Sequence, residues 1–285
     1  MGDRRQESPD ARSITCADGS QRTTRPEALR QEASVPPDNP GDLEEVTMNT
    51  QELAGLLGIW TDIDHEFIPT FRDWHSAEHM ALRIKTPGWY VGHRYAGLAG
   101  APGFFIAYET AAVSDLAGSA YHQSLNEPDL RTREALSHYR HSVRTIYGLR
   151  HHAGAARPTD APYYLTIRFT IESGSDHPIA WFGTVHLPAV CSIPGVLRAR
   201  LYETDAAISQ MPTEERKLYG AGPGEDRLLA TYELTSTDIL QSQAWRNAML
   251  EGAGTGGDCR EIRIGHQDLF VLEFTIYPPH LGKGG

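Results

Sequence analysis

The segment Trp74–Gly88 reads WHSAEHMALRIKTPG and places His75, Glu78 and His79 in the H-x-x-E-H spacing of a known class of zinc site. Two histidines four residues apart lie on one face of a helix and can bind the same ion. The remaining ligand would have to come from the residues before this helix, Asp62, Asp64 or His65. Nothing in their spacing selects one. Zinc is therefore one hypothesis, and a helix with a packed structural histidine is the other.

A later segment, Trp181–Gly195, reads WFGTVHLPAVCSIPG and repeats part of this pattern. Trp74 aligns with Trp181, and His79 aligns with His186 at the same offset. The same order of anchors continues downstream in the pairs AYET and TYEL, GSAY and SQAW, and TIY and TIY. Several matched anchors in one order indicate an internal duplication of the chain.

The repeat changes how the histidines are interpreted. His75 is replaced by Phe182 and Glu78 by Val185 in the second copy, so of the zinc pattern only His79 has a counterpart. Residues that a shared fold requires should recur in both copies. We therefore expect no metal, and we expect His75 to be a local substitution that faces solvent or the flank of the helix.

Each copy is predicted to fold as β-α-β-β-α-β, the unit of ferredoxin-like folds. In the first copy the strand GLLGIWTDI precedes a helix that Pro69 opens and Pro87-Gly88 ends. WYVGHRY, FFIAYET and SVRTIYGLR are its further strands, and the second copy has YYLTIRFTI, VLRARLY, RLLATYEL and LFVLEFTIY. The predicted organisation is a first repeat at 48–152, a linker at 153–162, and a second repeat at 163–280 with an insertion at 203–227.

Alternation along the strands predicts how the two sheets pack. One face of LTIRFTI is apolar and suited to helices: Leu165, Ile167, Phe169 and Ile171. The last strand is expected to place four apolar residues on one face: Phe270, Leu272, Phe274 and Ile276. The opposite faces mix polar and aromatic residues. The two sheets are therefore expected to pack face to face around a small, partly polar interior.

The pattern W…H-L-P-x-x-x-x-x-P-G…Y at Trp181–Tyr202, on such a unit, resembles the dimeric α/β-barrel superfamily, and within it the EthD-like proteins. The first copy carries a variant with Ala81 in place of the proline. The resemblance covers residues 53–150 and 163–277. It implies an α+β fold in which one chain supplies both halves of a barrel that two chains usually form. Activities of this superfamily include cofactor-free oxygenation, dehydration, cyclisation, isomerisation and haem-dependent chemistry, so the fold leaves the reaction open.

The candidate catalytic residues are chosen for proton transfer. Histidine exchanges protons near neutral pH, carboxyl and phenol groups can assist it, and the first half carries the better set of these groups. This acid–base set is Asp62, His79, His93 and Tyr95. The candidate substrate contacts are Trp60, Arg168, Arg200, Tyr202 and His186. The two guanidinium groups suit an anionic or enolate oxygen. In the alternative reading the histidines are structural and the charges lie on an uncovered sheet face. The matched pairs Tyr108/Tyr232 and Glu109/Glu233 are assigned to packing and sheet edges.

These features favour a small-molecule enzyme without an organic cofactor. Its expected chemistry is proton transfer of the lyase, isomerase or dehydratase type on an aromatic, polyketide-like or catabolic carbonyl compound. One alternative is a cofactor-free monooxygenase that acts on an electron-rich phenol. The others are a haem enzyme with His79 or His186 as axial ligand, and a non-catalytic ligand-binding module.

Composition limits the partners. The chain has 285 residues and a formal net charge of −11 without a basic stripe, which argues against nucleic acid or an anionic membrane as partner. No apolar run approaches the ~20 residues of a membrane span. Three scattered cysteines, Cys16, Cys191 and Cys259, fit a reducing cytoplasm. We expect a cytoplasmic protein with a small-molecule substrate, as a monomer or homo-oligomer.

Residues 1–47 differ from the rest of the chain. They are rich in Arg, Asp, Glu, Pro and Ser and nearly lack aromatic residues, so we expect them to be disordered. They contain no apolar core of a secretory signal. The stretch LEEVTMNT can be encoded by a purine-rich ribosome-binding run before Met48, so we expect translation to begin at Met48.

Overall fold

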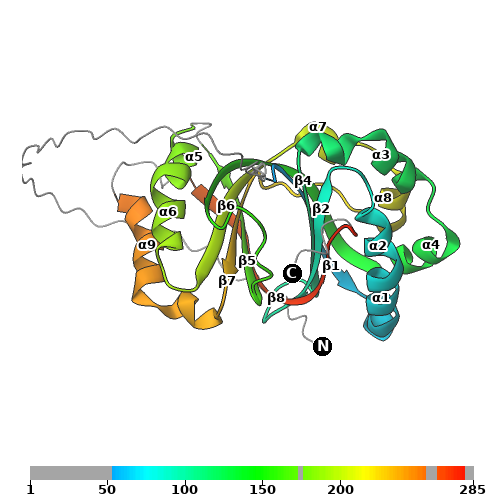
Figure 1. The fold of residues 1–285 in the computed structure, drawn as a ribbon, viewed down its shortest axis with the longest axis horizontal. Coiled ribbons are helices and arrows are strands. Elements are labelled where there is room, and N and C mark those ends of the chain that lie inside the picture. The colour runs from blue at the N-terminus through cyan, green and yellow to red at the C-terminus, as the bar shows by residue number, and fades with distance from the viewer. Residues whose placement is uncertain (1–52, 173–175, 255–261, 280–285) are drawn as a thin grey trace, which may run out of the picture.

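Eight strands form a closed antiparallel barrel in the order β1-β3-β2-β8-β5-β7-β6-β4 (Figure 1). The computed structural model describes residues 53–172, 176–254 and 262–279, with only the backbone of 250–254. The expected leader at 1–47 therefore lies outside the described residues. The strands are β1 (Gly55–Ile63), β2 (Trp89–Gly97), β3 (Phe104–Thr110), β4 (Tyr139–Gly154), β5 (Tyr163–Ile171), β6 (Val196–Thr204), β7 (Leu228–Leu234) and β8 (Ile262–Ile276).

Helices cover the barrel on two opposite sides (Figure 1). The first group includes α1 (Ile68–Trp74), α2 (Met80–Arg83), α3 (Ser119–Asn126), α4 (Leu130–Ser137), α7 (Ala206–Ser209) and α8 (Glu214–Tyr219). The second group is α5 (His177–Trp181), α6 (Leu187–Cys191) and α9 (Gln243–Gly254). Short 3-10 helices stand at His65–Phe67, Val113–Ala117 and Thr237–Gln241. Every helix in the described part is too short or too polar to cross a bilayer.

The helix expected from Pro69 is interrupted by a π-helical turn, His75–His79, between α1 and α2. A second π-helical turn, Phe182–His186, lies between α5 and α6. Such turns insert an extra residue and so change the direction in which the following side chains point. In each case the tryptophan before the turn packs on the histidine that ends it, with ring centroids 4.6 Å and 5.1 Å apart.

Apolar side chains form three cores. Two lie between the barrel wall and its helices, one on each side, and the third fills the barrel. The alternation in β5 is confirmed, because Leu165, Ile167, Phe169 and Ile171 all belong to the core beneath α5 and α6. The barrel interior is filled mainly by aromatic residues: Trp60, Tyr95, Phe105, Tyr147, Tyr164, Tyr202 and Phe270.

The prediction for the last strand is wrong in one respect. Phe270 and Leu272 face the barrel interior, whereas Phe274 and Ile276 pack under the first-half helices. The cause is a β-bulge: Arg94 pairs with Phe274 and Tyr95 with Leu272, which leaves Glu273 as an extra residue. One inserted residue reverses which face the following side chains occupy.

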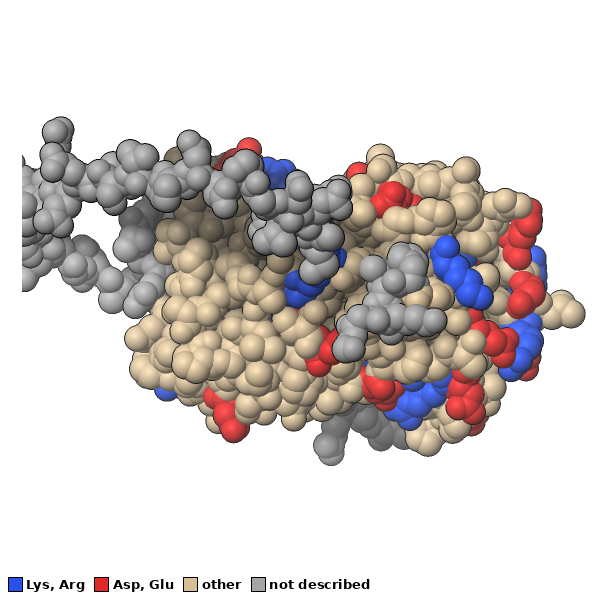
Figure 2. All heavy atoms as spheres, in the orientation of Figure 1, with Lys and Arg blue, Asp and Glu red and all other residues tan. Residues whose placement is uncertain are grey.

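The segment at 203–227, expected as an insertion, carries α7 and α8. Helix α8 packs against α3 and α4, so this segment reaches across to the first half of the chain. Ser209 accepts a hydrogen bond from the backbone N–H of Ile146 at 2.8 Å, and Gly222 forms a β-bridge with Val143 of β4. In the view of Figure 2, acidic and basic side chains intermingle over the first-half helices.

Candidate active site

A cavity of about 20 Å³ lies between the outer face of the first-half strands and the helices that cover it. This volume admits about one water molecule, so the site is closed in this structure. Its apolar lining is Leu57, Ile59, Trp89, Ile106, Leu125 and Leu136. Its polar lining is His75, His79, Arg83, Tyr108, Tyr121, Tyr139, Arg144, Glu215 and Tyr219. Aliphatic and aromatic side chains with converging polar groups also line small-molecule sites, although this lining is more polar than most.

His79 enters this cavity from the end of the first π-helical turn. Its Nδ1 atom is buried and has no hydrogen-bond partner. Burial, followed by the charge of Arg83 and the nearby His75, holds the pKa of His79 well below its ordinary value of 6.5. The imidazole is therefore neutral at neutral pH. A neutral imidazole with a free ring nitrogen can accept a proton.

Tyr108 lines the same cavity from β3, and its hydroxyl is also buried without a partner. Burial raises the pKa of Tyr108, so the phenol keeps its proton. A buried hydroxyl without a partner is costly to the fold. This hydroxyl is available to donate a hydrogen bond to a bound oxygen atom.

The corresponding residues of the second half are paired with each other. His186 Nε2 and the Tyr232 hydroxyl lie 2.8 Å apart, and His186 Nδ1 lies 3.3 Å from the carbonyl oxygen of Ala248. Both ring nitrogens of His186 therefore have partners, whereas His79 Nδ1 and Tyr108 border a cavity. The two halves carry the same pair of residue types. In the second half the histidine and the tyrosine bond to each other, and in the first half His79 Nδ1 and the Tyr108 hydroxyl are left without a protein partner beside the cavity.

His186 should make the protein sensitive to acid. Burial lowers its pKa to about 4 from 6.5, so in this range the unfolded chain binds the proton more tightly than the folded one. The free energy of unfolding should therefore fall as the pH drops from about 6.5 to about 4, by roughly 3 kcal/mol from this residue alone. Urea denaturation at a series of pH values measures this slope.

The control for this prediction is a pair of variants. His186→Phe combined with Tyr232→Phe removes the titrating group without leaving a buried hydroxyl unpaired, and it should flatten the pH dependence. Tyr232→Phe alone keeps the titrating imidazole and should keep the slope. An unchanged slope in the double variant would show that other groups govern acid unfolding.

A buried ion pair closes one side of the cavity. The Arg83 guanidinium of α2 donates to Glu215 of α8, and both side chains are at least 94% buried. Burial opposes the charge of Arg83, but the carboxylate of Glu215 outweighs it and raises the pKa of Arg83. A second contact joins α8 to the same wall, because the backbone N–H of Glu214 donates to Asn126 at 3.1 Å. The strand pattern alone did not identify Arg83 or Glu215.

Six of the predicted site residues lie on the other side of the barrel wall, in the interior. Trp60, His93, Tyr95, Arg168, Arg200 and Tyr202 are all at most 4% exposed. Arg168 donates to Asp268 at 3.0 Å and stacks on Trp60 at 4.4 Å. Arg200 donates to the carbonyl oxygen of Ala156 at 2.7 Å. These residues are therefore separated from His79 by the sheet.

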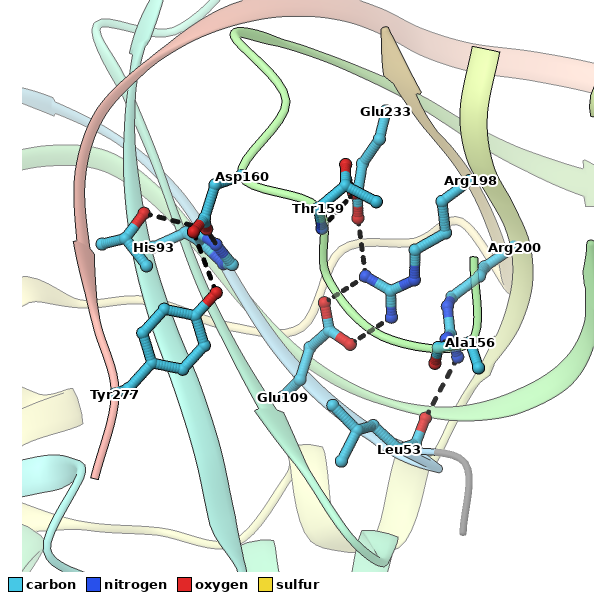
Figure 3. A network of polar contacts seen from close by, with 11 residues as sticks. Leu53, His93, Glu109, Ala156, Thr159, Asp160, Arg198, Arg200, Glu233 and Tyr277 are labelled. Atoms are coloured by element: carbon cyan, nitrogen blue, oxygen red, sulfur yellow. Dashed lines mark hydrogen bonds and ion pairs between the residues drawn. The ribbon is translucent and has the colours of Figure 1, made fainter. Parts of the chain in front are cut away.

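The structure does not assemble the predicted acid–base set around one cavity. His79 lies in the helical layer outside the barrel wall, whereas His93 lies inside, 2.8 Å from Asp160 (Figure 3). Asp62 stands at the barrel rim, where it accepts from the Gly103 N–H at 2.7 Å and contacts His141 at 3.1 Å. His186 lies under the second group of helices.

Figure 3 shows the polar network of the barrel interior. Arg198 donates to Glu109 at 2.8 Å and to Glu233 at 2.6 Å. Glu233 also accepts from the backbone and the hydroxyl of Thr159 at 2.9 Å and 2.6 Å. The assignment of the two glutamates to sheet edges is wrong, because the closed barrel has no edge there and both carboxylates point inward.

Of the two positions expected for His75, solvent or the flank of the helix, the first is wrong. His75 is buried in the cavity wall, and its Nδ1 lies 3.4 Å from Arg94. Among the described residues, no three His, Cys, Asp or Glu side chains lie together as ion ligands. Asp62 is engaged at the rim, and Asp64 accepts from Arg140 at 2.5 Å and contacts His138. His65, the remaining candidate, is exposed, and none of the three candidates joins His75 and His79 in such a group.

Haem fits neither histidine in this arrangement. An axial ligand needs a free ring nitrogen and room for the macrocycle. The ring nitrogens of His186 are both engaged, and in the closed form the cavity of about 20 Å³ beside His79 has no room for a macrocycle. The chemistry of this site is therefore assigned to the side chains of the chain and not to haem.

No protein-family model and no curated protein matches the sequence. Among solved structures, an anthrone oxidase-like protein is similar with a TM-score of 0.51 and 12% identity, over 80% of this chain and 94% of that chain. The fold is that of the dimeric α/β barrels. A variant chlorite dismutase from Candidatus Nitrospira defluvii has a TM-score of 0.46 and 10% identity, over 78% of this chain and 92% of that chain. The likeness to the anthrone oxidase-like protein shows the fold, and the EthD-like resemblance stays a prediction.

Proposed function

We propose that this chain is a small-molecule enzyme whose active site is the first-half cavity and whose general base is His79. The observation that carries the proposal is the pair of buried, unpartnered groups, His79 Nδ1 and the Tyr108 hydroxyl, on one cavity. Their counterparts His186 and Tyr232 satisfy each other at 2.8 Å. Unpaired buried polar atoms are rare in native folds and call for an explanation, and a ligand that completes their hydrogen bonds supplies one.

The proposed chemistry is removal of a proton from a carbon next to a carbonyl group. The Nδ1 lone pair of His79 takes the proton, the C–H electron pair forms the enolate double bond, and the carbonyl π pair moves to oxygen. Tyr108 donates a hydrogen bond to that oxygen as its charge develops. Return of the proton to another carbon gives isomerisation, and loss of a β-leaving group gives the lyase or dehydratase outcome.

A second candidate is cofactor-free oxygenation. It shares the first step, after which the deprotonated carbon forms a C–O bond to O₂. The resulting peroxide anion takes up the proton, and the hydroperoxide then loses water, which breaks the O–O bond and leaves a new carbonyl group. The similarity to the anthrone oxidase-like protein favours this candidate, because an anthrone is a carbonyl compound with an acidic methylene group. In both cases the substrate class is an aromatic or polyketide-like carbonyl compound, and the chain residues that act are the same.

The closed cavity requires movement before a substrate can enter. Helix α8 is the wall that the separate segment at 203–227 supplies, and the Arg83–Glu215 pair and the Asn126–Glu214 contact attach it to the rest of the site. We propose that α8 moves aside to admit the substrate. Closure over a bound substrate would exclude water from the reacting atoms.

We also propose that the barrel is an internal duplication of two ferredoxin-like units. Its support is the recurrence of a π-helical turn ending in His79 and in His186. Gly88 and Gly195 follow at matched sites with φ of 86° and 91°, a conformation that favours glycine. Superposition of 53–150 on 163–277 in an experimental structure tests this, and displaced histidines would contradict it.

The test of function uses anthrone in heavy water, with and without O₂. Proton-transfer activity should place deuterium in the anthrone methylene without O₂ uptake, at a rate well above the uncatalysed exchange. Oxygenase activity should consume O₂ in proportion to anthrone. Exchange and O₂ uptake that both equal the background would contradict the proposal and favour a binding module. Mass spectrometry and an oxygen electrode provide the two measurements.

A further inference from the structure

Arg144 is a buried cation on the wall of the proposed active site. It lies on β4, is 5% exposed and lines the cavity. Its guanidinium donates to the Tyr121 hydroxyl at 3.0 Å. Among the side chains that the structure describes, no carboxylate forms an ion pair with it. A buried charge without a counter-ion is costly to the fold.

The charges around the cavity do not balance. Arg83 and Arg144 are its cations and Glu215 is its carboxylate, and Glu215 is already joined to Arg83. Burial keeps His75 and His79 neutral, each with its pKa well below 6.5. With Glu215 charged, the lining therefore carries one more positive than negative charge. Glu215 pairs directly with Arg83 and, against the effect of burial, also raises the pKa of Arg144, but it forms no ion pair with the Arg144 guanidinium.

We propose that Arg144 and Tyr121 form an anion subsite, and that the ligand is a compound with an acidic enol or phenol bound as a monoanion. This inference rests on the proposed function and adds the substrate class to it. The guanidinium would hold the oxygen on which the negative charge rests after deprotonation, since its N–H groups form strong bonds with anionic oxygens. The aromatic and aliphatic lining would hold the ring or chain that bears it, on Trp89, Ile106, Leu125 and Leu136.

The proposal also explains why Arg144 faces the helices. On β4, Ile146 shares its outer face and belongs to the core beneath the helices, where an arginine would ordinarily be replaced by an apolar residue. The neighbouring Tyr147 belongs to the interior core. A charge placed on the apolar side of a strand indicates a role other than packing.

The test is binding of para-nitrophenol, whose phenol and phenolate forms absorb at different wavelengths. The wild-type chain should bind the phenolate and lower the apparent pKa of the bound probe. Arg144→Met should weaken phenolate binding roughly 10- to 100-fold, as for loss of a charged hydrogen bond, and abolish the pKa shift. Arg144→Lys, which keeps the charge, should retain most of both, and Tyr121→Phe should fall between them.

Nitrobenzene is the matched neutral probe, and Arg144→Met should bind it as the wild type does. Equal weakening for both probes, or absence of phenolate binding by the wild type, would overturn the anion subsite. If Arg144→Met fails to fold, phenolate binding by Arg144→Lys and Tyr121→Phe tests the subsite instead. His79→Asn should keep phenolate binding while losing anthrone exchange. Normal phenolate binding in all Arg144 variants, together with anthrone exchange by the wild type, would sink the subsite and leave the proposed function standing.

Discussion

His79→Asn should lower the rate of anthrone deuterium exchange by about 10²–10⁴-fold, the usual effect of removing a general base. Its melting temperature should change little, because Nδ1 of His79 has no hydrogen-bond partner to lose. Since the pKa of His79 lies well below 6.5, the imidazole is already deprotonated at neutral pH. The wild-type rate should therefore be flat around neutrality and fall only when the pH drops below that lowered pKa.

His186→Asn is the matched control, because it makes the same substitution at the corresponding turn of the second half. It breaks the 2.8 Å contact with Tyr232 and leaves that hydroxyl buried. We expect it to lower the melting temperature and to leave the exchange rate nearly unchanged. Equal losses of rate in both variants, each with a lowered melting temperature, would show that both histidines are structural and that the base lies elsewhere.

Much of the barrel could be predicted because its strands alternate. In β5, apolar residues at every second position can be buried only if helices cover that face, and they do. The prediction failed in β8, where the extra residue Glu273 reverses the alternation. No sequence pattern marks this bulge. Its carboxylate accepts from Arg94 at 3.0 Å, a contact between strands far apart in the chain.

The candidate site was harder to predict, because a strand pattern does not show which polar residues meet. His79 and His93 both suit acid–base chemistry, yet the sheet separates them. Glu215 reaches the cavity from the inserted segment, and its partner Arg83 stands 132 residues earlier. Two signals were nonetheless present in the sequence: the pairing of Tyr108 with Tyr232, and the alternation that places Arg144 on the same face as Ile146.

Substitution of Arg198 should produce a large loss of stability, because this residue joins both halves of the chain inside the barrel. It stands on β6 and contacts Glu109 of β3 and Glu233 of β7, and all three side chains are at most 5% exposed. Burial alone would raise the pKa of Glu109, but the Arg198 guanidinium outweighs it and holds that pKa below its ordinary value. One cation thus offsets the charge of two buried carboxylates.

Arg198→Met should lower the free energy of unfolding at neutral pH by about 3–5 kcal/mol, the usual cost of an uncompensated buried charge. In the wild type the lowered pKa of Glu109 stabilises the fold above the ordinary range of a carboxyl, and this stabilisation is lost as the pH falls through the lowered pKa. In the variant, burial raises the folded pKa, so protonation at mildly acidic pH relieves the repulsion. The deficit relative to wild type should therefore shrink as the pH falls.

The control combines Arg198→Met with Glu109→Gln and Glu233→Gln, which removes the cation and both charges together. Because replacing a whole buried ionic group is far less costly than removing one partner, this triple variant should recover most of the lost stability and lose the pH-dependent deficit. Urea denaturation of the three proteins across the pH series measures both. A deficit that is constant with pH and persists in the triple variant would mean that the aliphatic stem of Arg198, rather than its charge, holds the two halves of the barrel together.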